Sequence, residues 1–299
     1  MYFTKVRIAI FIITKKVVSI VIWGVVIALI VMVAVIYWYG RYVLPHKISV
    51  THKDIVSPLL TEDFQDISIL QFSDTHLGRH YLLGHLEELV DSINRLEPSI
   101  ITFTGDLFDR YDQTVLKKEE VIMALSRLHA PLGKFAVYGN HDYDGRGSEL
   151  YKEYLSEAGF RVLVNEVCDI TLENGNEMTI AGLDDFLLGK PDIERTLTQL
   201  QPDRFNLLLV HEPDIVDRVK AYPVHLQLSG HTHAGQVQLP FLGPVITPSL
   251  GRKYVEGMYV LPTDSNTHLY VNRGIGTTRL KIRYGSIPEL AVFHLRRKT

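Results

Sequence analysis

The stretch that decides the fold is YGNHD at residues 138–142, which continues the apolar segment 135–138. That segment predicts a buried strand, and Gly139 lets the chain turn sharply where the strand ends. Asn140 and His141 then follow at the carboxyl end of the strand, where α/β sheets bind their ligands. Because Gly-Asn is also a common turn pair, the stretch acquires a chemical meaning only beside the other strand ends.

Strand-like segments alternate with amphipathic, helix-like segments around this stretch. Strands are predicted at residues 67–72, 100–104 and 135–138, and helices at residues 82–96, 115–128 and 149–158. This alternation is typical of βαβ units and a largely parallel sheet. Further strands are predicted at residues 161–164, 170–172, 178–181, 205–210, 224–228, 268–272 and 290–295. We therefore expect an α/β fold of two stacked mixed β-sheets flanked by helices, an α/β/β/α sandwich.

The composition is that of an ordinary globular protein. The chain has 299 residues, of which 46% are hydrophobic and 22% charged, and its net charge is -3. No nucleic-acid-binding surface is expected, because such surfaces depend on an excess of clustered Lys and Arg. The single cysteine, Cys168, excludes an internal disulfide and a cysteine-based zinc site.

Five predicted strands end in residues that can bind metal. These residues are Asp74 and His76, Asp106, Asn140 and His141, His211, and His231 and His233. Residues two apart in an extended segment point the same way, so the Asp-x-His and His-x-His pairs each present two ligands together. Buried Asp and His side chains need a partner, and two divalent ions would supply it. Mixed imidazole and carboxylate ligands suit zinc, manganese or iron.

Each of these strand ends also has a simpler interpretation. His211 alone could be a hydrogen-bonded structural residue, and Asp74 could cap a helix. Metal-binding residues at five strand ends are much less expected by chance than at a single strand end. The order excludes two other classes of metal enzyme, since amidohydrolases carry His-x-His on the first strand and metallo-β-lactamases carry a His-x-His-x-Asp-His block early.

In this order the motifs resemble the calcineurin-like metallophosphoesterases. Asp-x-His, Gly-Asp, Gly-Asn-His-Asp, a lone His and Gly-His-Thr-His are all present between residue 67 and the C-terminus. Three further segments, 182–185, 271–276 and 288–290, resemble the membrane-associated bacterial branch that includes YkuE- and YaeI-type phosphodiesterases. The resemblance implies a phosphoesterase with two divalent ions.

The resemblance also implies a role for each motif residue. One metal would be held by Asp74, His76 and His233. The other would be held by Asn140, His211 and His231, and Asp106 would bridge the two. His141 would face the scissile phosphate, and Asp142 would orient His141 through its ring nitrogen. Asp109 is either a supporting neighbour or a solvated acid, and Arg79 and His80 either reach substrate or form a solvated pair.

This ligand set carries only two negative charges, on Asp74 and Asp106, so two divalent ions would leave the centre positive. A positive centre suits a phosphodiester or pyrophosphate anion. Metals ~3.5–4 Å apart would activate a hydroxide for in-line attack. His141 would stabilise the developing charge or protonate the leaving oxygen.

Residues 17–39 are almost entirely apolar and predict a transmembrane helix. At ~1.5 Å per residue they can cross a ~30 Å hydrocarbon core. Basic residues precede this segment and aromatic residues follow it: Lys5, Arg7, Lys15 and Lys16, then Tyr37, Trp38, Tyr39 and Tyr42. A buried soluble helix and a cleaved signal peptide are the alternatives, and the apolar core is too long for the second. We expect an uncleaved signal anchor.

The expected organisation has four parts. Residues 1–16 form a basic cytoplasmic N-terminus, 17–39 the anchor, 40–66 a linker and edge segment, and 67–299 the metallophosphoesterase domain. The basic N-terminal side favours a single-pass protein of the cell membrane with an extracytoplasmic domain. Lys and Arg residues on the other side of the anchor oppose this orientation.

Three functions agree with this organisation. The first is a membrane-anchored phosphodiesterase with a lipid- or envelope-linked substrate. The second is a lipid-linked nucleoside-diphosphate sugar pyrophosphatase, which would favour a cytoplasmic domain. The third is an anchored metal-binding scaffold without turnover. Such a scaffold would be expected to have lost a ligand or the His of Gly-Asn-His, and this chain keeps both.

Overall fold

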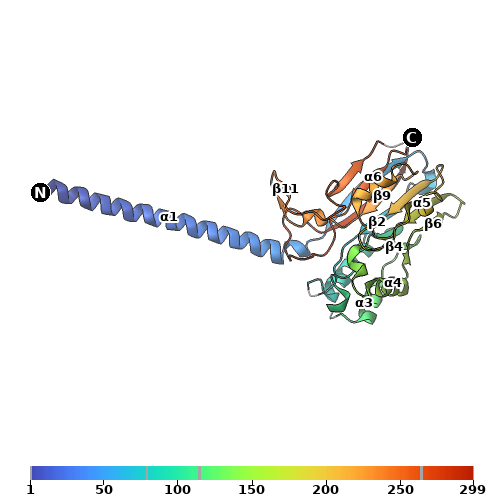
Figure 1. Cartoon of the computed structure of the whole chain (residues 1–299), viewed down its shortest axis with the longest axis horizontal. Helices are drawn as coiled ribbons and strands as arrows, with labels where there is room; N and C mark the ends of the chain where they lie inside the picture. The colour runs from blue at the N-terminus through green and yellow to red at the C-terminus, as the bar shows by residue number, and fades with distance from the viewer. Residues whose placement is uncertain (1, 79, 114–115, 263–264, 299) are drawn as a thin grey trace.

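A long helix, α1 (Tyr2–Tyr42), leads into a domain built on two six-stranded sheets (Figure 1). The computed structural model describes residues 2–78, 80–113, 116–262 and 265–298. The helix is long and apolar enough over Phe11–His46 to cross a membrane, as a membrane anchor or a signal sequence would be. The large apolar side chains that the structure describes between Phe11 and Tyr39 are almost all exposed, so this part of α1 is not a core helix of the domain.

The first sheet contains the strands that precede three of the site motifs. Its order is β1 (Ser49–Ser57), β14 (Glu289–Arg297), β2 (Ser68–Phe72), β3 (Ile100–Phe103), β4 (Lys134–Ala136) and β5 (Arg161–Val162). Strands β2 to β5 run parallel, whereas β14 is antiparallel to β2. The edge strand β1 pairs in parallel with β14.

The second sheet contains the strands that precede the other two site motifs. Its order is β12 (Gly257–Val260), β13 (His268–Val271), β9 (Leu226–Ser229), β8 (Phe205–Leu209), β7 (Glu177–Gly182) and β6 (Glu166–Thr171). The four inner strands are parallel and the two edge strands are antiparallel to their neighbours. A separate hairpin joins β10 (Gln238–Leu239) to β11 (Gly243–Pro244).

Alternating side chains of the strands pack the domain into four layers. In β2, Ile69 faces the second sheet, whereas Leu70 and Phe72 face helices α2 (Leu83–Asn94), α3 (Lys118–Ser126) and α4 (Gly147–Glu157). In β8, Leu207 faces the first sheet and Leu208 the opposite side, where α5 (Ile193–Leu197) and α6 (Val216–Val219) pack. The α/β/β/α prediction is confirmed.

This topology brings the site motifs together. The parallel strands β2, β3 and β4 end at one edge of the first sheet, and β8 and β9 end at one edge of the second. Because the sheets are stacked, the five loops that leave these strand ends can meet at one place.

Candidate metal centre

The loops that follow β2 and β3 are joined backbone to backbone. The N–H of Asp74 donates to the carbonyl of Gly105 at 2.9 Å, and the N–H of His76 donates to that of Asp106 at 3.1 Å. Asp74, His76 and Asp106 all have positive φ, as do His231 and His233 on the loop after β9. Left-handed backbone is uncommon in residues other than glycine and clusters at functional sites. These five ligand candidates are thus held in strained conformations that aim their side chains inward.

Glycines allow the loops to approach one another closely. A Cβ added at Gly139 would lie 2.7 Å from the backbone nitrogen of Asp106 and 2.8 Å from Cε1 of His211. At Gly230 it would collide with the side chains of Ser73 and Asp74. Gly139 and Gly230 therefore make room for the neighbouring ligands.

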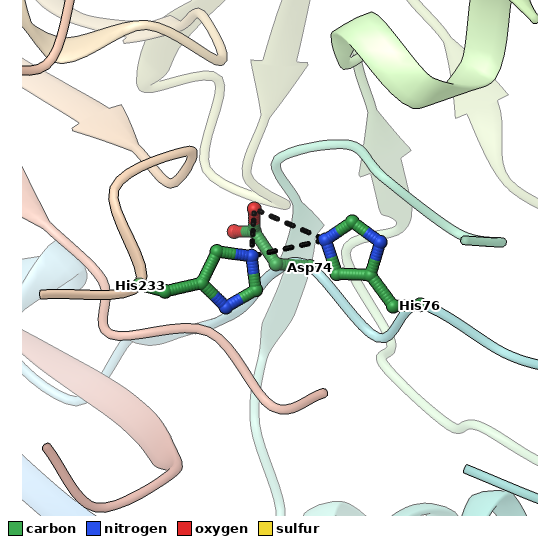
Figure 2. A group of neighbouring side chains, drawn as sticks. All are labelled: Asp74, His76 and His233. Atoms are coloured by element: carbon green, nitrogen blue, oxygen red, sulfur yellow. Dashed lines mark hydrogen bonds and ion pairs between the residues drawn. The ribbon is translucent and has the colours of Figure 1, made fainter. Parts of the chain in front are cut away.

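Asp74, His76 and His233 form the first cluster and point toward one another (Figure 2). Nε2 of His76 lies 3.0 Å from Nε2 of His233, which in turn lies 3.3 Å from Oδ1 of Asp74. All three side chains are buried. Two imidazole nitrogens and one carboxylate oxygen thus face a common point.

Asp74, Asp106 and His211 form the second cluster. Nε2 of His211 lies 3.4 Å from Oδ2 of Asp106 and 4.0 Å from Oδ1 of Asp74. The same Oδ2 of Asp106 lies 3.5 Å from Nε2 of His76. Asp74 thus belongs to both clusters, and Oδ2 of Asp106 lies close to one imidazole nitrogen of each.

Hydrogen bonds on the outer side of two imidazoles define which nitrogen is available for a metal. Nδ1 of His211 lies 2.6 Å from the carbonyl of Thr104, and Nε2 of His231 lies 2.8 Å from that of Ser249. A carbonyl only accepts, so each of these nitrogens carries the proton. In the neutral rings the lone pair is then on Nε2 of His211 and on Nδ1 of His231, an arrangement common for metal-binding histidines.

The donor set fits divalent metal ions. Among the described residues, Nδ1 of His76, Oδ1 of Asn140 and Nε2 of His211 are buried without a hydrogen-bond partner. A buried polar atom without a partner is costly. Coordination would satisfy the last two of these atoms, and imidazole, carboxylate and amide oxygen together suit zinc, manganese or iron.

Burial and neighbouring charges shift the pKa values of the ligand candidates. Burial lowers the pKa of His76 to about 3, and His141 adds to the effect. Burial also lowers the pKa of His231 to about 4, with His211 as the second cause. Both imidazoles are therefore neutral near pH 7, as coordination requires. Burial alone would raise the pKa of Asp106, but His211 and His141 outweigh it and hold that pKa well below its usual value. Although burial lowers the pKa of His211, Asp106 outweighs it and raises that pKa well above its usual value, so coordination at Nε2 of His211 would release a proton.

The resemblance implied that Asp142 orients the His141 ring, but the structure gives the Asp142 carboxylate other hydrogen-bond partners. The carboxylate accepts hydrogen bonds from the backbone N–H groups of Asp106 (2.7 Å), Gly139 (2.8 Å) and Leu107 (3.0 Å) and from the Tyr111 hydroxyl (2.9 Å). The turn η4 (Asn140–Tyr143) folds Asp142 back onto these loops and leaves His141 half-buried at the rim. Asp142 thus joins the loops after β3 and β4.

Asp109 is the residue that holds the His141 ring. Its backbone carbonyl accepts from Nδ1 of His141 at 2.8 Å. Its carboxylate lies 3.8 Å from Nδ1 of His76 and 3.9 Å from Nδ1 of His141, so these three residues form a further cluster. Of the two interpretations of Asp109, the structure thus favours the supporting neighbour. His80 lines a small cavity together with Arg41 from the end of α1, and Arg79 lies outside the described residues.

The sequence prediction missed Arg283, which is fully buried behind His233. Its Nη2 lies 3.2 Å from Nδ1 of His233 and donates to the carbonyl of Gly274 at 3.0 Å. Burial lowers the pKa of Arg283 to about 9, so the guanidinium stays charged near pH 7. Arg283 follows an irregular loop, and no motif marked it as part of the site.

The chain is similar to several known proteins. Residues 67–235 match the family model described as calcineurin-like phosphoesterase. The chain is 46% identical over 260 residues to the uncharacterized metallophosphoesterase YkuE of Bacillus subtilis, a match that covers 87% of this chain and 90% of that protein. It is 27% identical over an alignment of 316 positions to the UDP-2,3-diacylglucosamine pyrophosphatase LpxG of Chlamydia trachomatis, which covers 86% of this chain and 92% of that protein. Among solved structures, NAD nucleotidase of Haemophilus influenzae is 14% identical with a TM-score of 0.46, covering 70% and 45%.

Proposed function

Because this chain belongs to the calcineurin-like phosphoesterase family, we propose that it is a membrane-anchored phosphodiesterase with two divalent ions. Its substrate would carry a phosphodiester or pyrophosphate bond at the membrane or in the cell envelope. One observation carries the proposal: Asp74, Asp106 and His211 leave three strand ends of two sheets and meet in one buried place.

The seven ligand candidates divide into two sets. Asp74, His76 and His233 would hold one ion, and Asn140, His211 and His231 the other. Asp106 belongs to both sets, and the position of its Oδ2 between Nε2 of His76 and Nε2 of His211 supports this assignment. The ions would be manganese, zinc or iron, given the mixture of nitrogen and oxygen donors.

The chemistry follows from these ligands and from His141. Divalent ions at this place would bind phosphoryl oxygens and supply an activated water for attack on phosphorus. The ring of His141 stands edge-on to the ring of His76, with their centroids 4.7 Å apart, and its side chain is 29% exposed. Burial alone would lower the pKa of His141, but Asp106 and the Asp109 carbonyl outweigh it and raise that pKa. His141 would therefore be able to protonate the leaving oxygen.

We propose that α1 is an uncleaved anchor and that the domain lies outside the cytoplasm. The apolar residues 17–39 of α1 are preceded by Arg7, Lys15 and Lys16, and basic residues favour the cytoplasmic side. A reporter enzyme active only outside the cytoplasm, fused after Thr299, should be active in cells. If that reporter is inactive, and a second reporter that works only in the cytoplasm is active at the same position, the domain lies in the cytoplasm and the proposed topology is wrong.

A pyrophosphatase acting on a lipid-linked nucleoside diphosphate sugar is the second candidate. The similarity to the pyrophosphatase of Chlamydia trachomatis over 86% of this chain favours it. The two candidates differ in the bond they cleave. Phosphate analysis after incubation with a nucleoside-diphosphate lipid and with a simple lipid phosphodiester would separate them.

The direct test of the activity is hydrolysis of a p-nitrophenyl phosphodiester by the metal-loaded full chain. His141→Ala should keep its metal but lower turnover by ~10²–10⁴-fold, because it removes an acid catalyst and no ligand. His129→Ala, an exposed histidine on the connection after α3, is the matched control and should retain full turnover. Full turnover in His141→Ala would refute its role, and no hydrolysis by the unchanged protein would refute the activity.

A further inference from the structure

The β10–β11 hairpin carries an uncharged apolar surface on the side of the domain from which α1 leaves (Figure 1). We call residues 239–246, with the sequence LPFLGPVI, the apolar hairpin. Its exposed large apolar side chains are Leu239, Phe241, Leu242, Val245 and Ile246. Phe241 is fully exposed and Leu242 is 79% exposed. A cluster of this kind on a folded domain marks a surface that contacts protein or membrane.

Backbone hydrogen bonds tie the base of this hairpin to the last turns of α1. The N–H of Arg283 donates to the carbonyl of Gly40 at 2.9 Å. The next residue, Tyr284, donates to the carbonyl of Gln236 at 2.8 Å and accepts from the N–H of Gln238 at 2.7 Å. Arg283 and Tyr284 therefore link the end of α1 to the base of the hairpin. This link gives the hairpin a defined position beside the end of the apolar helix.

The surroundings of the apolar hairpin have the composition of a membrane interface. The end of α1 carries four exposed aromatic residues, as a helix does where it leaves a membrane: Tyr37, Trp38, Tyr39 and Tyr42. Segments 36–48 and 277–284 contain Arg41, Lys47, Arg279, Lys281 and the buried Arg283 but no Asp or Glu. The acidic residue at the base of the hairpin, Glu256, accepts a hydrogen bond from Nε2 of Gln238. Basic groups at this level attract anionic lipid headgroups. Charge and apolar surface thus favour the same partner, a lipid bilayer.

We propose that the apolar hairpin inserts into the surface of the bilayer that holds α1. The proposal rests on the anchor assigned to α1 under the proposed function. It also narrows the substrate class, because the hairpin follows the turn that contains the ligand candidate His233. Nε2 of Gln238 donates to the carbonyl of Ala234 at 3.0 Å, which fastens hairpin and turn together. Insertion would hold the metal centre at the level of lipid headgroups, where it would meet phosphoesters carried by lipids.

The test places an environment-sensitive fluorophore on the full chain in vesicles of neutral and anionic phospholipids. The label is attached through Leu242→Cys in a Cys168→Ser background, which removes the single native thiol. Met123→Cys is the matched control, because Met123 is an exposed apolar residue on α3. The label at position 242 should shift to shorter emission wavelengths and lose intensity when the lipid chains are brominated. The label at position 123 should do neither.

Two outcomes would overturn the proposal. If the label at position 242 keeps the emission wavelength that it has in water, the hairpin is solvated. A shifted emission that brominated lipid does not quench would show contact with protein, from a second copy of this chain or a partner. Neither readout depends on catalysis, so an inactive preparation would count against the proposed function alone.

A kinetic comparison tests the consequence for substrates. The double substitution Phe241→Asp and Leu242→Asp should lower hydrolysis of a phosphodiester lipid in vesicles while leaving a soluble p-nitrophenyl diester unaffected. Met123→Asp should affect neither rate. Equal loss on both substrates, or no loss on the vesicle substrate, would contradict a role of the hairpin at the membrane.

Discussion

The side chains of this site are held by hydrogen bonds directed away from the place where ions would bind. His211 is fixed by the Thr104 carbonyl and His231 by the Ser249 carbonyl. Each contact orients a ring and assigns its proton, which leaves the other nitrogen for coordination. These two ligand candidates are therefore positioned by the fold before any ion would bind.

Asp142→Asn tests the structural role that replaces the expected one. The amide group of Asn would place a donor against the backbone N–H groups of Asp106 and Gly139. Each N–H left unpaired should cost about 1–3 kcal/mol. Urea unfolding should show this loss of stability, whereas the exposed control Asp144→Asn should unfold near the wild-type midpoint. Equal midpoints for both variants would mean that the Asp142 carboxylate does not hold the loops together.

For single residues, the sequence predicted which side chains gather at the site better than it predicted their hydrogen-bond partners. Asp74, His76, Asp106, His211 and His233 do meet, because period-two motifs at the ends of parallel strands leave few other arrangements. The role of Asp142 and the presence of Arg283 could not be predicted. Both depend on how irregular loops fold back, and no periodic pattern describes that.

The ligand candidates at the strand ends meet only because the loops that carry them pack closely against one another. Gly105, with a φ of +95°, lies against Gly139, so the turns after β3 and β4 touch backbone to backbone. The alternation of strands and helices predicted both sheets and α2, α3 and α4. It did not predict the β10–β11 hairpin, because a segment rich in Gly and Pro has no regular period.

Gly139→Ala tests this close approach. The added methyl group would lie 2.7 Å from the backbone nitrogen of Asp106 and 2.8 Å from Cε1 of His211, so both ligands must shift. We expect weaker binding of the second ion, measured by calorimetric titration with manganese. Gly84→Ala is the control, because nothing lies within 4 Å of its added methyl group. Unchanged affinity in Gly139→Ala would show that the loops have room to separate.

At the scale of the whole molecule, α1 is docked on the wall of the metal centre. Gly40 packs against Ile282 and accepts from the N–H of Arg283, whose guanidinium lies beside His233. The apolar span, the apolar hairpin and the metal centre are thus connected through residues 282–284. Length and hydropathy predicted the span itself, but its contact with the domain depends on a glycine that carries no such signal.

Gly40→Leu should loosen this docking. A Cβ at position 40 would lie 2.9 Å from the Arg283 carbonyl, and overpacking of this kind costs ~1–3 kcal/mol. Trypsin should then cleave after Arg41 and Lys47 faster than in the unchanged chain held in vesicles. Gly24→Leu, which meets nothing within 4 Å, should leave the cleavage rate as it was. Equal rates for both variants would mean that α1 is not packed on the domain.

The central claim is that loops from two sheets together hold two divalent ions. Its most direct test is the metal content of the purified full chain, measured by mass spectrometry after loading with manganese and removal of free ions. The account predicts about two ions per chain, about one in His211→Ala, and about two in the control His294→Ala, which alters a histidine on β14 outside the site. Equal metal content in His211→Ala and the unchanged chain would contradict it.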